Sequence, residues 1–313
     1  MREPLAFHEL PNGRGATTPG VGGMSWPVAL RLGRVSNLPT IWSNVLAGIV
    51  LSGAAITGAQ AIPLMISLSL FYVGGMFLND AFDRELDQRT RPDRPIPAGD
   101  VRAATVFVYG FGLLALGLAL LLAVGYGMPQ GTGWRASVAG VLLAAMIVLY
   151  DIWHKANPIG PLLMGLCRLL VYIIAGIAVA GAVPERLSLA AFVSLCYLIG
   201  LTYVAKQENL QRVKNIWPLL FLAVPFAYAA PFAVTGGAVA VLAALLLATV
   251  LFALVLMFRP GASDIPHAMM LLIAGISLLD GLFMAGQGQT FLSAVSVAAF
   301  LLTLAFQRFI AGT

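Results

Sequence analysis

Long apolar runs separated by short polar connections occupy most of the chain. Each run is roughly 17–23 residues long, enough for a helix to cross a hydrocarbon core of about 30 Å. Gly and Pro occur inside several runs, which is typical of membrane helix bundles. The pattern predicts ten apolar helices, at residues 36–57, 61–79, 103–124, 134–151, 159–181, 188–205, 216–234, 237–258, 266–286 and 290–307.

The composition supports a membrane location. Of the 313 residues, 60% are hydrophobic and only 10% are charged, which excludes a disordered chain or an ordinary soluble domain. We therefore expect an all-α polytopic membrane protein with nine transmembrane helices and a tenth C-terminal hydrophobic helix, which either crosses the membrane or lies flat at its interface. We divide the chain into a flexible cytosolic tail (1–29), a transmembrane domain (30–286) and an additional C-terminal hydrophobic segment (287–313).

The positions of the cysteine and histidine residues indicate neither a disulfide nor a metal site. Cys167 and Cys196 lie within apolar runs, so we interpret both as core residues rather than as a disulfide or a thiolate site. The three histidines show no zinc-binding spacing. The basic residues form no patch with interleaved aromatics, so membrane lipids and not nucleic acid are the expected partners of the positive charge.

Basic residues indicate how the chain is oriented. Most of the 18 Lys and Arg residues fall in the N-terminal segment or in the connections after the second, fourth, sixth and eighth predicted helices, whereas Arg135 and Arg186 fall on the opposite side. The positive-inside rule then places the N-terminus and the connection 80–102 in the cytoplasm. We expect the membrane to be a bacterial inner (plasma) membrane.

Nearly half of the 13 acidic residues share the connection after the second predicted helix. If that helix continues past residue 79, then Asn79, Asp83 and Asp87 stand at i, i+4 and i+8 on one face. Like charges at this spacing repel unless a cation neutralises them, and oxygen ligands of this kind suit Mg²⁺. The alternative is a solvated helix end whose acids pair with neighbouring arginines.

Two consecutive motifs carry a resemblance to a known family. Residues 79–87 match the NDxxDxxxD signature of the UbiA-type intramembrane prenyltransferases, and residues 94–99 (RPIPAG) look like the R-P-[IL]-P-x-G that follows it there. The hydropathy pattern resembles that family over most of residues 30–286. The resemblance implies Mg²⁺-dependent transfer of an isoprenyl group from its diphosphate to a lipophilic or membrane-accessible acceptor.

The same resemblance assigns roles to the motif residues. It implies that Asn79, Asp83 and Asp87 hold the metal, which makes Asp83 and Asp87 catalytic. Asp80 would be a further ligand or an acceptor beside the metal, and Arg94 would bind phosphate oxygens. The active site would open to the cytoplasm and laterally to lipid.

The opposite wall of the site departs from the family. Where the family carries a second aspartate motif, residues 202–209 read TYVAKQEN, with Lys206 and Glu208 as the charged members. Either Lys206 pairs with the diphosphate directly, or catalysis has been lost, or both residues are interfacial anchors. Within the family this departure is similar to the EboC-like branch.

Four further residues in or beside the predicted helices need an explanation. Tyr150 resembles a family tyrosine of the substrate site, and Lys155 resembles a family lysine that contacts the diphosphate. The resemblance therefore implies that Lys155 is a third catalytic residue beside Asp83 and Asp87, although positive-inside anchoring equally explains it. Arg168 lies well inside a predicted helix and needs a polar cavity, the diphosphate or an acid as its partner. Asp280 is likewise an acid inside a predicted helix, and a helix–helix hydrogen bond is its favoured explanation.

A second class of function competes with the transferase. The chain could be a non-catalytic component that binds or exports an isoprenoid or metabolite while retaining the diphosphate cavity. An internal inverted repeat would favour a transporter, and no convincing repeat is visible in the sequence.

Overall fold

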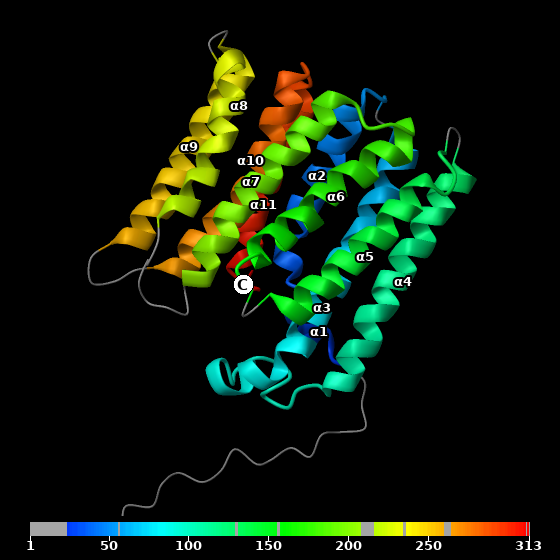
Figure 1. Cartoon of the computed structure of the whole chain (residues 1–313), viewed down its shortest axis with the longest axis vertical. Helices are drawn as coiled ribbons and strands as arrows, with labels where there is room; N and C mark the ends of the chain where they lie inside the picture. The colour runs from blue at the N-terminus through cyan, green and yellow to red at the C-terminus, as the bar shows by residue number, and fades with distance from the viewer. Residues whose placement is uncertain are drawn as a thin grey trace, which may run out of the picture.

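The computed structural model describes residues 24–55, 57–128, 131–154, 157–207, 216–233, 236–259, 264–310 and 312. Within this part of the chain the secondary structure is helical, as the hydropathy pattern predicts (Figure 1). The elements are α1 (Trp26–Leu32), η1 (Val35–Asn37), α2 (Leu38–Ser52), α3 (Gly58–Thr90), α4 (Ala103–Gly127), α5 (Arg135–Trp153), α6 (Gly160–Ala180), α7 (Glu185–Gln207), η3 (Trp217–Ala223), α8 (Val224–Ala233), α9 (Gly237–Phe258), α10 (Ile265–Gly286) and α11 (Thr290–Gln307).

Among the described residues, nine helical segments are long and apolar enough to cross a membrane, which confirms the polytopic membrane fold. The segment α11 is one of the nine, so the tenth predicted helix has the length of a membrane span. The seventh predicted span, 216–234, is instead broken into η3 and the ten-residue α8. Pro218, Pro225 and Pro231 remove three backbone donors from this stretch, which explains why it forms no continuous α-helix of membrane-spanning length.

Helix α3 is longer than a membrane requires. Its 33 residues extend about 50 Å at 1.5 Å per residue, compared with a hydrocarbon core of about 30 Å. The predicted span ended at residue 79, but the helix continues to Thr90 without interruption. The acidic motif therefore occupies the helical extension of a membrane span.

The interior is divided between two groups of helices that share α2 and α6. One hydrophobic cluster joins α2 and α6 to α3, α4 and α5, and the other joins them to α7, α8, α9 and α10. Gly48 permits the close approach of the shared pair, since a methyl group there would lie 2.8 Å from the carbonyl oxygen of Tyr172. Helices α2 and α6 thus form the centre of the bundle.

The C-terminal helix packs against the bundle through both apolar and polar contacts. Helix α11 lies along α10 and α2. At its end, the side-chain amide of Gln307 donates a 2.9 Å hydrogen bond to Asn37 Oδ1 in η1. The division of the chain into a tail, a domain and an added segment stays a prediction, and residues 1–23 lie outside the described part.

Candidate active site

The acidic motif is buried although it lies beyond the apolar part of α3. Asn79, Asp80, Asp83 and Asp87 expose 9%, 7%, 8% and 4% of their surface, respectively, while Glu85 on the other face of the helix is exposed. The predicted i, i+4, i+8 row is therefore confirmed as one face of a continuous helix that is turned into the protein. This burial excludes the alternative interpretation, in which the acidic residues lie at a solvent-exposed helix end.

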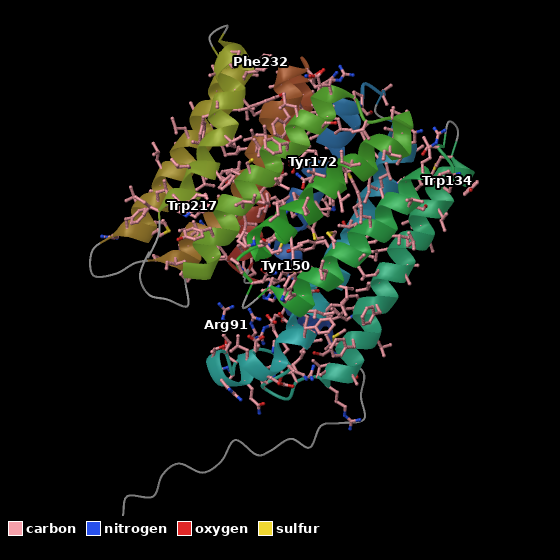
Figure 2. All side chains as sticks on the ribbon, viewed as in Figure 1. Arg91, Trp134, Tyr150, Tyr172, Trp217 and Phe232 are labelled. Atoms are coloured by element: carbon pink, nitrogen blue, oxygen red, sulfur yellow. The ribbon has the colours of Figure 1, made fainter. Side chains whose placement is uncertain are left out.

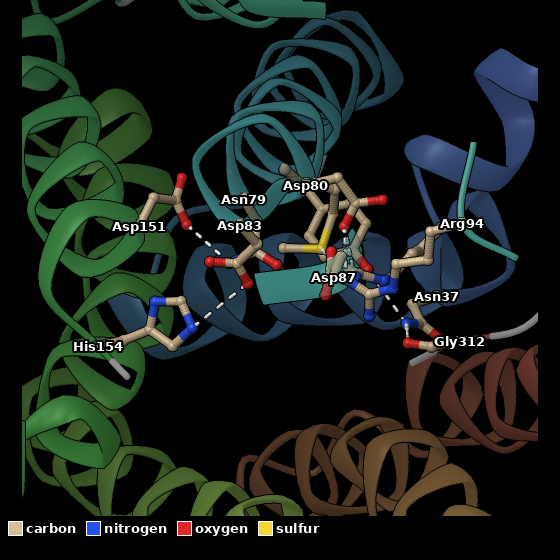
Figure 3. Close-up of polar contacts among 12 residues, drawn as sticks. Asn37, Asn79, Asp80, Asp83, Asp87, Arg94, Asp151, His154 and Gly312 are labelled. Carbon is tan, nitrogen blue, oxygen red and sulfur yellow. Dashed lines mark hydrogen bonds and ion pairs between the residues drawn. The ribbon is translucent and has the colours of Figure 1, made fainter. Parts of the chain in front are cut away.

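Two arginines, Arg34 before η1 and Arg94 in the segment after α3, neutralise two of the acids. Asp80 Oδ1 accepts hydrogen bonds from Arg34 Nη2 at 2.9 Å and from Arg94 Nη1 at 3.1 Å. Arg94 Nη1 also lies 2.8 Å from Asp87 Oδ2. Figure 3 shows Arg94 reaching Asp87 from beside the end of α3. Arg94, predicted to bind phosphate oxygens, therefore bridges two carboxylates in this structure.

The local backbone explains how both arginines reach the acids. The segment RPIPAG turns back on itself, since Ala98 N donates to Arg94 O at 2.8 Å and Asp100 N donates to Pro95 O at 2.9 Å. Arg34 adopts left-handed backbone angles (φ 41°, ψ 48°) between α1 and η1, a conformation that costs a non-glycine residue about 1–2 kcal/mol. Burial lowers the pKa of Arg34, but Asp80, Tyr72, Tyr150 and Asp83 together outweigh this effect and raise the pKa above its ordinary value.

On the other side of the row, helix α5 contributes an acid and an imidazole. Asn79 Nδ2 donates a 3.2 Å hydrogen bond to Asp151 Oδ1, and His154 Nε2 lies 3.7 Å from Asp83 Oδ2. The His154 ring stacks on Tyr150 with centroids 4.6 Å apart. Tyr150 is thus close to the acidic row, as its predicted role requires, although its part in substrate binding stays a prediction.

Asp151 is a residue of this site that neither sequence motif includes. It is 4% exposed and follows Tyr150 directly near the end of an otherwise apolar helix. An acid at the end of a membrane span, next to a residue already singled out, was the available signal.

Arg168 and Asp280 belong to one buried polar network at the centre of the bundle. Arg168 Nη1 donates a 2.5 Å hydrogen bond to Asn44 Oδ1. Asn44 Nδ2 lies 2.7 Å from both oxygens of Asp280, and Asp280 also accepts hydrogen bonds from Ser43 and Tyr172. Figure 2 shows Tyr172 in the middle of the bundle. The predicted helix–helix hydrogen bond of Asp280 is confirmed, and the substrate role of Arg168 stays a prediction.

Several predicted residues cannot be placed. Lys155 and Glu208 lie outside the described residues, and of Lys206 only the backbone in α7 is described. The charged residues of the second wall therefore remain sequence predictions.

The acidic row has the donor chemistry of a magnesium site. Within the described residues, no three His, Cys, Asp or Glu side chains cluster closely enough to hold a metal by themselves. Mg²⁺, however, commonly takes one or two carboxylates and fills its other positions with water and substrate phosphates. Asn79, Asp83 and Asp87 offer such oxygen atoms on one buried face, so these residues fit the ion.

Comparison with known proteins identifies the family. The family model described as the UbiA prenyltransferase family matches residues 38–274, which is most of the chain. The chain belongs to the UbiA prenyltransferase family. A digeranylgeranylglyceryl phosphate synthase of Methanoculleus marisnigri is 28% identical over 143 residues, covering 44% of this chain and 46% of that protein. The match thus spans less than half of that relative's length.

Two solved structures show the same UbiA fold. One, described as a digeranylgeranylglyceryl phosphate synthase, is 20% identical with a TM-score of 0.58 and covers 83% of this chain and 98% of its own. The other is a UbiA homologue from Archaeoglobus fulgidus bound to GPP and Mg²⁺. It is 18% identical with a TM-score of 0.51, and the match covers 89% of this chain and 99% of that one. These likenesses concern the fold.

Proposed function

We propose that this UbiA family protein transfers an isoprenyl group from its diphosphate to a lipophilic acceptor, with Mg²⁺ as cofactor. The observation that carries the proposal is the buried face formed by Asn79, Asp83 and Asp87 at the end of a membrane helix. Oxygen ligands brought together in this buried row require positive charge, which Arg94 supplies to Asp87, and binding of a diphosphate calls for a divalent cation in addition. The GPP and Mg²⁺ bound by the Archaeoglobus fulgidus homologue support the same assignment.

The main chemical task of such a site is to stabilise the diphosphate as it leaves. Mg²⁺ held by Asn79, Asp83 and Asp87 would supply Lewis-acid neutralisation of that charge. Arg94 and Arg34 stand beside the row and can donate hydrogen bonds to phosphate oxygens while Asp80 keeps their guanidinium groups in place. Preorganised donors in a site that excludes water act most strongly on charge that develops in the transition state.

Lys155 and Lys206 are the further basic residues that we propose for diphosphate binding, with Tyr150, Arg168 and Glu208 completing the substrate-binding set. The acceptor class is best tested with a glyceryl phosphate lipid, since the Methanoculleus relative is named for a product of that kind. Membership of the EboC-like branch stays a prediction.

We also propose that the active-site end of the bundle faces the cytoplasm. In Figure 1 the C-terminal ends of α3 and α7 both point toward the lower part of the view, and the described basic residues Arg84, Arg89, Arg91 and Arg94 belong to the end of α3 and the segment after it. The bacterial origin of the membrane stays a prediction, since the named relatives come from archaea.

The function is tested with protein purified in detergent, radiolabelled isoprenyl diphosphates of graded length, and Mg²⁺ or EDTA. We expect Mg²⁺-dependent transfer to a geranylgeranylglyceryl phosphate acceptor, with loss of at least about 100-fold in Asp83→Ala. The matched control is Glu85→Ala, which removes an exposed carboxylate two residues away and leaves the rate unchanged.

The competing function makes a different prediction in the same experiment. A non-catalytic binding or export component would bind the diphosphate in a Mg²⁺-dependent manner and would transfer nothing to any acceptor. Absence of Mg²⁺-dependent diphosphate binding in folded wild-type protein would overturn both functions.

A further inference from the structure

Helix α5 faces the acidic row with a carboxylate that the motifs of the sequence do not include. Asp151 is 4% exposed, and its Oδ1 accepts a 3.2 Å hydrogen bond from Asn79 Nδ2. Figure 3 shows Asp151 and His154 extending from one side toward Asp83 on α3. The contact therefore joins a residue of α5 to the first member of the row.

This hydrogen bond determines which atom of Asn79 can bind a cation. A carboxylate can only accept, so the side-chain amide of Asn79 must present its NH₂ group to Asp151. The amide oxygen of Asn79, which is the atom a hard cation requires, is thereby directed away from Asp151. Partners that fix a metal ligand in this way typically change metal affinity by 10–100-fold when mutated.

Among the described residues, the second carboxylate oxygen of Asp151, Oδ2, is buried and has no hydrogen-bond partner. The ion pairs of Arg34 and Arg94 are with Asp80 and Asp87 and do not include Asp151. A buried carboxylate oxygen without a partner is costly, and a cation or its bound water would satisfy it.

We propose that Asp151 is a positioning residue of the divalent-cation site. It holds the Asn79 amide so that its oxygen faces the cation, and it adds a negative charge to the site from a second helix. This inference rests on the proposed function, because it requires a cation at the row of Asn79, Asp83 and Asp87. It also offers a source of negative charge in a chain whose second aspartate motif is absent.

The test is an electron paramagnetic resonance titration of Mn²⁺ with detergent-solubilised protein and inorganic pyrophosphate. Asp151→Asn keeps the shape of the side chain and removes its charge. We expect the dissociation constant for Mn²⁺ to rise about tenfold or more. The melting temperature without metal should not fall, since removal of a buried charge does not destabilise the apoprotein in the way that loss of a packing residue would.

The control is Asp264→Asn, which removes an exposed carboxylate at the start of α10 and should leave Mn²⁺ binding unchanged. Asp151→Glu, which retains the charge, should recover most of the affinity. If Asp151→Asn does not fold, Asp151→Ser provides the second charge-free variant.

Two negative results have different meanings. Unchanged Mn²⁺ affinity in a folded charge-free variant, with binding lost in Asp83→Ala, would overturn the role of Asp151 and leave the proposed function standing. Failure of the wild-type protein to bind Mn²⁺ with pyrophosphate would overturn both.

Discussion

Arg94 Nη1 lies 2.8 Å from Asp87 Oδ2, and this ion pair joins the segment after α3 to the last turns of the helix. The same nitrogen also contacts Asp80, so one guanidinium neutralises two acids of α3. The side chain of Arg94 is 15% exposed and lies beside the last turns of this helix. Arg94 is therefore held in position before any diphosphate arrives.

Replacing Arg94 tests whether this position serves substrate binding. Arg94→Gln removes a charge-assisted contact worth about 1.5–3 kcal/mol, so we expect KM for the isoprenyl diphosphate to rise roughly 10–100-fold. The measurement is initial rate against diphosphate concentration at saturating Mg²⁺. Arg89→Gln, an exposed arginine in the last turn of the same helix, is the control and should retain the wild-type KM. Equal KM values in the two variants would contradict the role of Arg94.

The local features of this site could be predicted from sequence, because they depend on residues close together in the chain. The spacing of Asn79, Asp83 and Asp87 specifies one helical face wherever the helix continues. The span predicted at 216–234 was wrong, because hydropathy takes no account of the backbone donors that Pro218, Pro225 and Pro231 remove.

The contacts between helices could not be predicted in the same way. The pairing of Asp80 with Arg34 spans 46 residues, and that of Asn79 with Asp151 spans 72. The sequence spacing of these residues does not indicate that they are in contact, because both contacts depend on how α3 packs against its neighbours. The two core clusters that meet at α2 and α6 arise from this packing.

The hydrogen bond from Tyr172 to Asp280 predicts a measurable stability difference. Tyr172→Phe leaves the buried Asp280 carboxylate with one donor fewer, although Ser43 and Asn44 still contact it. We expect the free energy of unfolding to fall by about 1–3 kcal/mol, measured by denaturation in detergent micelles.

Tyr228→Phe is the matched control for this prediction. The rings of Tyr172 and Tyr228 both contact Phe283 edge-on, with centroids 6.1 and 5.3 Å away, respectively. Both variants lose one hydroxyl next to the same aromatic ring, and Tyr172 is the one that bonds Asp280. Similar losses of stability in the two variants would show that the contact with Asp280 contributes nothing.

The contact between Gln307 and Asn37 predicts that α11 stabilises the N-terminal part of the bundle. Gln307→Ala removes the donor to Asn37 Oδ1, a buried hydrogen bond across 270 residues. We expect a loss of about 1 kcal/mol in the free energy of unfolding. The control is Arg308→Ala, which changes the adjacent exposed residue and should leave stability unchanged. An equal loss of stability in both variants would show that the effect comes from the end of α11 in general and not from this hydrogen bond.

The proposed orientation is tested by placing a cysteine at either end of the bundle. In a background with Cys167→Ala and Cys196→Ala, Glu85→Cys lies in the extension of α3 and Glu185→Cys at the start of α7, and both positions are exposed. In intact cells, a membrane-impermeant maleimide should label Glu185→Cys and spare Glu85→Cys until the membrane is opened with detergent. Labelling of Glu85→Cys in intact cells would place the acidic row outside the cytoplasm. That result would contradict the positive-inside argument, because the basic residues near the row would then lie on the external side.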